Sequence, residues 1–121
     1  MENKIMPNSS KAESVLLGGI LSDPSIYDSV ANYINEDVLY ENTNKILWNK
    51  VGEMIKNGYH VDMVTVSESL TTKEKASGLT AYYISGLFEH RAGKDTSIVY
   101  AKSIYEKYLM RRVVEETTKI Q

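Results

Sequence analysis

The 121-residue sequence contains no cysteine and only two prolines. Without cysteine, the chain has no disulfide and offers no thiolate to a metal ion or to nucleophilic catalysis. Pro7 and Pro24 both lie where helices could begin. The sequence also lacks a signal peptide and any apolar run long enough to cross a bilayer, so we predict a cytoplasmic protein with no membrane partner.

An excess of charge is also missing, because 14 basic and 16 acidic residues leave a formal net charge of −2. This balance provides no global field that would attract nucleic acid. The length and the 42% hydrophobic content predict one soluble, compact domain with a substantial core. Nine tyrosines against one phenylalanine indicate amphipathic contact surfaces, since tyrosine joins an apolar ring to a polar tip.

Apolar residues recur at helical spacing along most of the chain. Residues 1–9 are polar and are predicted to be a flexible lead-in. Ser10 and Glu13 have the spacing of a capping box, and the Gly18–Gly19 pair predicts close backbone packing inside the first helix. The expected helices cover residues 10–21, 24–34, 42–56, 63–70 and 79–87, with a longer one from residue 97 to the end.

The segment TTKEKASG, residues 71–78, is predicted to be a polar loop, because it lacks apolar periodicity. Residues 61–66 are rich in β-branched side chains, but Asp62 is a good helix N-cap, and we therefore predict a helix there. The sequence thus predicts an all-α protein, a compact orthogonal bundle of about five short helices followed by one long C-terminal helix.

The segment HRAGKDTS, residues 90–97, resembles a phosphate-binding loop only in its Gly-Lys pair. A P-loop requires Ser or Thr after the Lys, whereas Asp95 follows Lys94, and Phe88 occupies the position of the first glycine. We therefore predict that this chain binds no ATP. The segment is expected to be a turn between helices, in which Gly93 has a positive φ and residues 95–97 supply the N-cap.

Other catalytic or metal-binding patterns are lacking. His60 and His90 are isolated from further ligands, so no metal site and no cofactor is expected in this chain. No spacing of carboxylates suggests acid–base catalysis. The last helix has a basic edge, which glutamates interrupt, and at most a weak DNA contact is expected there. That edge consists of Lys102, Lys107, Arg111 and Arg112.

The apolar positions of the last helix cover more than one face, whereas a surface helix normally has a single apolar stripe. We therefore expect this helix to contact both the body of the domain and a second copy of the chain. The residues predicted to mediate this self-association are Ile104, Tyr105, Tyr108, Leu109 and Val113.

From Pro7 onward, the sequence resembles the N-terminal domain of the DnaB-type hexameric replicative helicases. The segment VDMVTVSESL, residues 61–70, carries the most specific part of the resemblance, and the order of the motifs adds to it. The other matching pieces are residues 12–13, 15–21, 44–47, 78–84 with Tyr83, 100–101 and 109–114.

The resemblance implies that residues 10–121 form a collar domain, an all-α head followed by the first arm of a helical hairpin. Six such heads would form a ring above a motor domain, and ATP and Mg²⁺ would belong to that motor domain, which this sequence does not contain. The chain is then either a fragment of a helicase or a free-standing, phage-type copy of its collar. With one hairpin arm, we expect weak dimers.

The resemblance also implies that primase and the helicase loader dock on this domain. Such recognition rests on a few aromatic anchors with a polar rim, and Tyr83, with Tyr82 beside it, is the predicted anchor. Lys11 and Glu13 are expected to orient the partner by charge. Two alternatives stay open, the helicase-binding domain of a primase and a small DNA-binding helical protein.

Overall fold

The computed structural model describes residues 6–120, with side chains through Lys119. Residues 1–5, five of the nine residues in the expected lead-in, lie outside the described residues, as does Gln121. The described part of the chain contains seven helices and no strand, which confirms the all-α prediction. The helices are α1 (Ser10–Ser22), α2 (Ser25–Val30), α3 (Asn42–Lys56), α4 (Met63–Glu68), α5 (Thr72–Ala76), α6 (Ala81–Glu89) and α7 (Lys94–Ile120).

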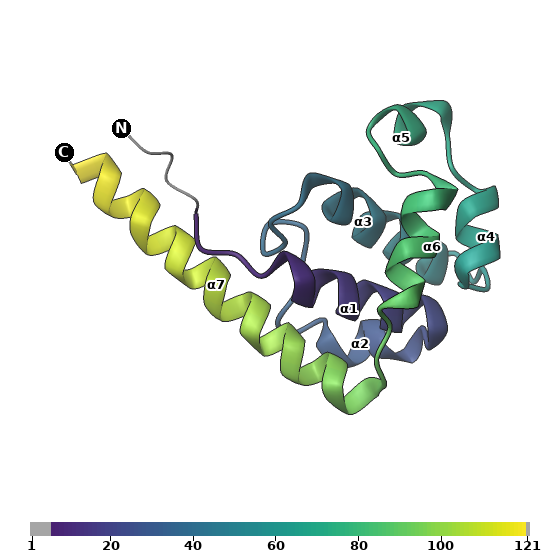
Figure 1. Ribbon diagram of the computed structural model, residues 1–121, viewed down its shortest axis with the longest axis horizontal. Coiled ribbons are helices and arrows are strands. Elements are labelled where there is room, and N and C mark those ends of the chain that lie inside the picture. The colour runs from purple at the N-terminus through teal and green to yellow at the C-terminus, as the bar shows by residue number, and fades with distance from the viewer. Residues whose placement is uncertain (1–5, 121) are drawn as a thin grey trace.

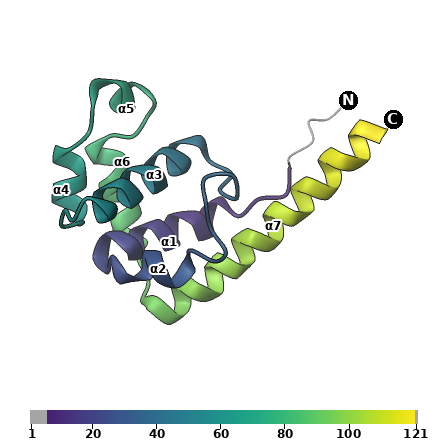
Figure 2. The ribbon, with the colours of Figure 1, turned by 180° about the vertical axis from the view of Figure 1, so that it is seen from behind.

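Helix α1 lies at the centre of the fold and contacts α2, α3, α6 and α7. Helices α1 to α6 together form the head, and α7 runs along one side of it and projects beyond it (Figures 1 and 2). The described chain begins beside the distal half of α7, where Arg111 donates to the Pro7 carbonyl, and it ends at the projecting end of α7 (Figure 1). The architecture therefore has two parts, a packed head and a long arm.

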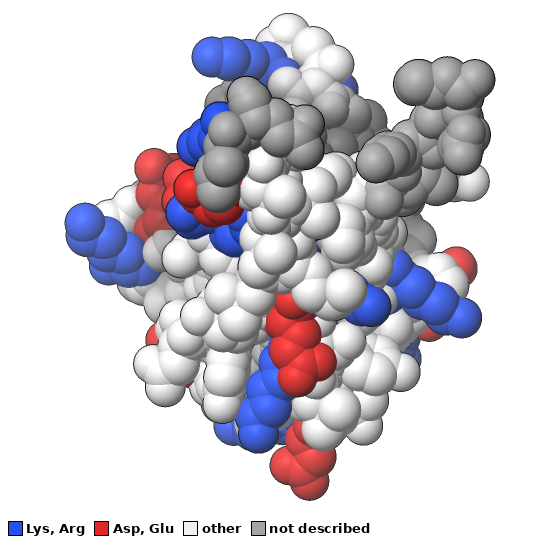
Figure 3. All heavy atoms as spheres, turned by 90° about the vertical axis from the view of Figure 1, so that its left-hand side faces the viewer, with Lys and Arg blue, Asp and Glu red and all other residues white. Residues whose placement is uncertain are grey.

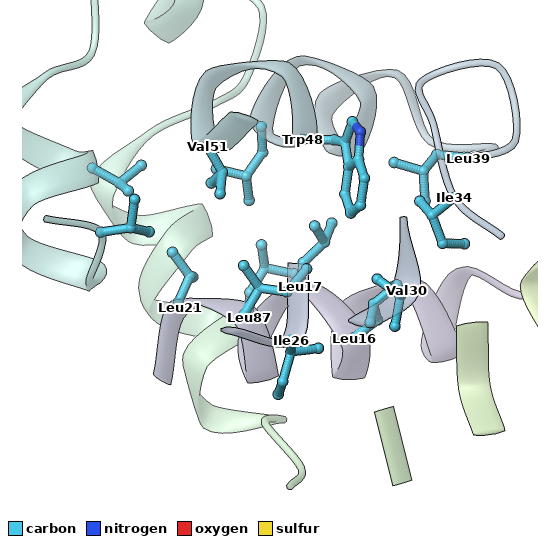
Figure 4. Packing of buried hydrophobic residues seen from close by; sticks show 14 of the residues in the cluster. Leu16, Leu17, Leu21, Ile26, Val30, Ile34, Leu39, Trp48, Val51 and Leu87 are labelled. Atoms are coloured by element: carbon cyan, nitrogen blue, oxygen red, sulfur yellow. The ribbon is translucent and has the colours of Figure 1, made fainter. Parts of the chain in front are cut away.

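The core of the head forms where α1 meets α2, α3 and α6 (Figure 4). Leu16 and Leu17 of α1 are fully buried, and Trp48 of α3 points toward them. The Trp48 ring also stacks on Tyr27 with ring centroids 4.1 Å apart. Trp48 is therefore a core residue and helps to join α3 to the region around α2.

The Gly18–Gly19 pair lies where α1 crosses two other parts of the chain. A Cβ atom on Gly18 would overlap the Leu87 carbonyl oxygen of α6, and one on Gly19 would come within 2.9 Å of the Ala92 carbonyl oxygen. Neither position has room for a side chain, because backbone atoms do not yield as flexible side chains do. The predicted close backbone packing is confirmed.

Helix α5 contradicts the predicted loop at residues 71–78. The Thr71 hydroxyl accepts a hydrogen bond from the Glu74 amide at 3.1 Å, and the Glu74 carboxylate accepts one from the Thr71 amide at 2.9 Å. This capping box satisfies the first amides of a short helix, and Lys50 pairs with Glu74 at 2.9 Å. No side chain of α5 is buried, which is why apolar periodicity did not reveal it.

The predicted capping box at Ser10 and Glu13 is wrong. Ser10 is already inside α1, the N-cap residue is Ser9, and its side chain makes no capping hydrogen bond. Glu13 instead turns into the head, where it is fully buried. By contrast, Asp62 caps α4 as predicted, with its carboxylate accepting from the Thr65 amide at 2.8 Å.

Residues 90–93 form the expected turn between α6 and α7, but its details differ from the prediction. Helix α7 begins at Lys94, three residues earlier than expected. Gly93 does not have a positive φ, and the glycines that do among the described residues are Gly58 and Gly78. Ser97 is buried inside α7 and donates to the Ala92 carbonyl at 3.4 Å, so it is not an N-cap.

Candidate functional site

Helix α6 presents two adjacent tyrosines in different environments. Tyr82 is 90% exposed, whereas Tyr83 is half-buried and packs against the core. The Tyr83 hydroxyl donates a hydrogen bond to the Asn44 side-chain oxygen of α3. Of the two predicted anchor residues, Tyr82 is therefore the free one, and Tyr83 is joined to the interior of the head.

Asn44 connects Tyr83 to the buried carboxylate of Glu13. The Asn44 amide donates to Glu13 at 2.9 Å, and the backbone amides of Tyr40 and Glu41 donate to it at 2.6 and 3.3 Å. Burial raises the pKa of the Glu13 carboxyl, and these three donors partly offset that effect. Glu13 is therefore buried below the exposed surface. It influences that surface only through its hydrogen bonds to Asn44, Tyr40 and Glu41.

The pKa of Tyr83 reflects the same environment. Burial, together with the negative charges of Glu41 and Glu13, raises the pKa of Tyr83 to about 12. The phenol is thus held in its protonated form as a hydrogen-bond donor to Asn44. This network of α1, α3 and α6 side chains was not predicted, since its members are distant in the sequence.

A hollow of about 390 Å³ lies beside the two tyrosines. It opens between α6 and α1, because Ser14 of α1 lines it together with Gly86 and His90. Lys11 is exposed on α1, about one helical turn from Ser14. The predicted docking residues Tyr82, Tyr83 and Lys11 thus lie on or near one concave surface, and Glu13 lies beneath it.

The distal part of α7 exposes a set of apolar side chains. Leu109 is 44% exposed and Val113 is 65% exposed, while Tyr105 and Tyr108 are half-buried against the head. Ile104 is only 1% exposed and belongs to the core, so it is removed from the predicted self-association surface. Two exposed apolar residues that the prediction missed complete the set, Met110 and Val114.

Arg111 contradicts the predicted basic edge of α7, because its side chain is buried. The guanidinium donates to the Val38 carbonyl at 2.6 Å and to the Pro7 carbonyl at 3.0 Å. It also lies over the Tyr40 ring, 5.2 Å from the centroid. Arg111 is therefore a structural residue and does not belong to a surface for DNA.

Charge is mixed on the face that Figure 3 shows. Basic and acidic side chains lie next to one another there, and uncharged residues cover much of the remaining surface. Arg112 follows the same pattern, since it pairs with Glu116 at 3.7 Å on α7. This face therefore offers no continuous basic surface to a nucleic acid backbone.

His60 lies 3.0 Å from the Asp62 carboxylate, and both residues belong to the connection that leads into α4. Among the described residues, no group of three or more His, Asp or Glu side chains is placed to hold a metal ion. The part of the chain that the structure describes also contains no helix with the length and apolar character to cross a membrane.

Comparison with known proteins gives a consistent picture. The sequence model of the family described as "DnaB-like helicase N terminal domain" matches residues 5–106. The replicative DNA helicase DnaB of Buchnera aphidicola subsp. Baizongia pistaciae is 26% identical over 116 residues, which are 95% of this chain and 25% of that protein. The replicative DNA helicase DnaC of Bacillus subtilis is 24% identical over 99% of this chain and 27% of its own length.

The fold also matches a solved structure. The crystal structure of the N-terminal domain of DnaB helicase from Mycobacterium tuberculosis superimposes with a TM-score of 0.88 at 24% sequence identity. The match covers 96% of this chain and 85% of that one. The chain therefore has the fold of that domain and spans about a quarter of the length of the two helicases that it matches.

Proposed function

This chain belongs to the family of DnaB-like helicase N-terminal domains, and on that premise we propose that it acts in DNA replication as the collar of a hexameric replicative helicase. In this role it is a non-catalytic module with two tasks. It associates with other copies of itself through α7, and it docks primase and the helicase loader on its head. ATP and Mg²⁺ belong to a motor domain in this proposal.

The observation that carries the proposal is the exposed apolar surface of distal α7. Leu109, Met110, Val113 and Val114 lie within two helical turns, and each is at least 40% exposed. A contiguous apolar surface of this kind is a liability on a monomer unless another protein covers it. Since α7 is the arm that projects from the head, a second arm is the occupant that fits the family (Figure 1).

Sedimentation of the wild type and of a Leu109→Lys, Val113→Lys double variant tests this assignment. Both side chains are exposed, so the variant should keep its helical circular dichroism and lose the dimers of the wild type. Val99→Lys is the matched control, because Val99 is 61% exposed on the same helix but lies near its start. Dimers that survive the double change would place self-association elsewhere.

The hollow beside Tyr82 and Tyr83 supports partner docking on the head. It combines an aromatic side chain that is 90% exposed with a concave surface, and Lys11 lies nearby on α1. Exposed aromatic anchors beside a pocket are the residues that carry most binding energy in protein interfaces. We therefore assign the docking of primase or loader to this surface, with Tyr82 as its outer anchor and Tyr83 as its floor.

Surface plasmon resonance with the cognate primase C-terminal domain or loader tests the docking surface. Tyr82→Ala is expected to weaken binding by roughly thirtyfold, which corresponds to about 2 kcal/mol for a central anchor. Tyr59→Ala is the matched control, since Tyr59 is 66% exposed at the far end of α3 and does not line this hollow. Equal affinities of the two variants would reject the surface.

Tyr83 needs a separate variant, because its hydroxyl belongs to the buried network. Tyr83→Phe keeps the ring and removes the hydrogen bond to Asn44, whereas Tyr83→Ala removes both. If the ring forms the floor of the docking surface, Tyr83→Ala weakens binding and Tyr83→Phe does not. Loss of binding in both variants would assign the effect to the network rather than to the ring.

A further inference from the structure

The connection between α2 and α3, residues 31–41, is held between two buried charges. The Glu13 carboxylate accepts hydrogen bonds from the amides of Tyr40 and Glu41. The Arg111 guanidinium donates to the Val38 carbonyl at 2.6 Å, two residues before Tyr40. A carboxylate from α1 thus binds the donors of this connection, and a guanidinium from α7 binds one of its acceptors.

Arg111 occupies a special position along α7. Among the α7 side chains that the structure describes, it is the last buried one, since residues 112–119 are all exposed. Its second nitrogen donates to the Pro7 carbonyl at 3.0 Å, and the Tyr40 and Tyr108 rings lie 5.2 and 5.8 Å from the guanidinium carbon. The arm therefore leaves the head at Arg111, and the last contacts that hold it there are made by this side chain.

These contacts are directional. A guanidinium is planar, and charge-assisted hydrogen bonds to two carbonyls fix both its position and its orientation. Apolar side chains such as Ile104 hold the earlier turns of α7 without such directionality. A buried arginine is also costly to desolvate, and residues 6–119 provide no carboxylate in ion-pairing distance of it. An apolar residue would fill the same place at lower cost.

We propose that Arg111 is a positioning residue, which fixes the direction in which α7 leaves the head by clamping the connection 31–41 against Glu13. The proposal rests on the proposed function, because the direction of the arm matters when distal α7 meets a second arm. A rigid arm meets its partner with little loss of conformational entropy. An arm that points correctly for about a tenth of the time would bind about tenfold more weakly per subunit.

Spin-label distances measure the direction of the arm without reference to self-association. The wild-type sequence has no cysteine, so two introduced cysteines carry the labels without interference. Asn57, at the end of α3, and Thr117, on distal α7, are both exposed and suit Asn57→Cys and Thr117→Cys. The labelled protein is measured at low concentration and mixed with unlabelled chain. The expected result for the wild-type arm is one narrow distribution of distances between the two labels.

Arg111→Met should broaden this distribution while the head keeps its helical circular dichroism, because methionine fills the space but binds neither carbonyl. Arg112→Met is the matched control, since the neighbouring side chain is exposed and should leave the distribution narrow. Arg111→Lys keeps the charge but not the planar fork, so an intermediate width is expected. If Arg111→Met does not fold, the widths of the distance distributions of Arg111→Lys and Arg112→Lys are compared instead, and they decide whether Arg111 fixes the direction of the arm.

The same variants are then compared by sedimentation. Weaker dimers in Arg111→Met, by about tenfold or more, with the exposed face of α7 unchanged, support the positioning role. A narrow distribution in a folded Arg111→Met overturns the proposal, as does a broad distribution with undiminished dimers. If the Leu109→Lys, Val113→Lys variant also keeps its dimers, the proposed self-association through distal α7 is wrong. In that case the width of the distance distribution alone decides whether Arg111 positions the arm.

Discussion

Gly18 of α1 lies directly against the backbone carbonyl of Leu87 in α6. A Cβ atom at Gly18 would overlap that carbonyl oxygen and would come within 3.2 Å of the Arg91 Cα atom. The distance between the two helices is therefore set by the absence of a side chain. Since both neighbours are backbone atoms, the structure could accept a larger residue only by moving α6.

Gly18→Ala is expected to destabilise the domain by about 1–3 kcal/mol, because overpacking forces the two backbones apart. Gly86→Ala is the matched control within α6, since a Cβ atom there meets nothing within 4 Å. That change should stabilise the domain by about 0.5–1 kcal/mol through the higher helix propensity of alanine. Urea unfolding of both variants measures the difference, and equal effects of the two would contradict the close crossing.

Glu13 should make stability depend on pH in an unusual direction. Because burial raises the pKa of Glu13 in the folded state above 4.5, the stability linked to this group is fully present below about pH 4.5. It is lost as the pH rises through the folded pKa. We expect the unfolding free energy of the wild type, relative to Glu13→Gln, to fall as the pH rises above about 4.5 and through the raised pKa of the folded state.

The exposed Glu36→Gln controls for the loss of one carboxylate charge, and any slope that it shows is subtracted. Acidic groups that are the same in both proteins cancel in the comparison. A relative unfolding free energy that rises with pH would show the opposite linkage. In that case, the three hydrogen-bond donors would lower the pKa of Glu13 by more than its burial raises it.

Tyr83 is expected to ionise late in an alkaline titration. Burial is the main cause that raises its pKa from 10.0 to about 12, so the stability linked to this phenol is present below about pH 10 and lost as the pH rises through about 12. The difference in tyrosinate absorbance between the wild type and Tyr83→Phe isolates one of the nine tyrosines. We expect its midpoint at about pH 12.

The same difference measured in urea gives the reference midpoint of the unfolded chain. A folded-state midpoint equal to that reference would mean that the Tyr83 hydroxyl is open to water. It would also mean that Asn44 does not hold the Tyr83 hydroxyl, so the buried network would not support the docking surface.

Much of the fold follows from local patterns in the sequence. Asp62 caps α4 as its position predicted, and the expected helix over residues 42–56 is α3, which has Asn57 as its C-cap and is followed by Gly58, a glycine with φ of 78°. Helix α5 shows the limit of apolar periodicity, because a short polar helix can be held by its cap and one ion pair alone. The Thr71–Glu74 spacing was the signal that could have revealed it.

The site depended on contacts that no local pattern reveals. Glu13 has the spacing of a capping residue, but its partners lie 27 to 31 residues away, and only the folded chain brings them to it. Arg111 has the appearance of a surface charge, yet its carbonyl partners are 73 and 104 residues distant. Tyr82 and Tyr83 differ in exposure because adjacent residues on a helix point about 100° apart.

Helix α5 has a practical consequence, because none of its side chains is buried. Opening this helix exposes no apolar surface, so its amide hydrogens should exchange with solvent through small local openings, long before those of α1. Proteases would be expected to cut there first for the same reason. A foreign sequence, such as a peptide tag or a fluorescent domain, could be inserted at α5 while the core of the head stays folded.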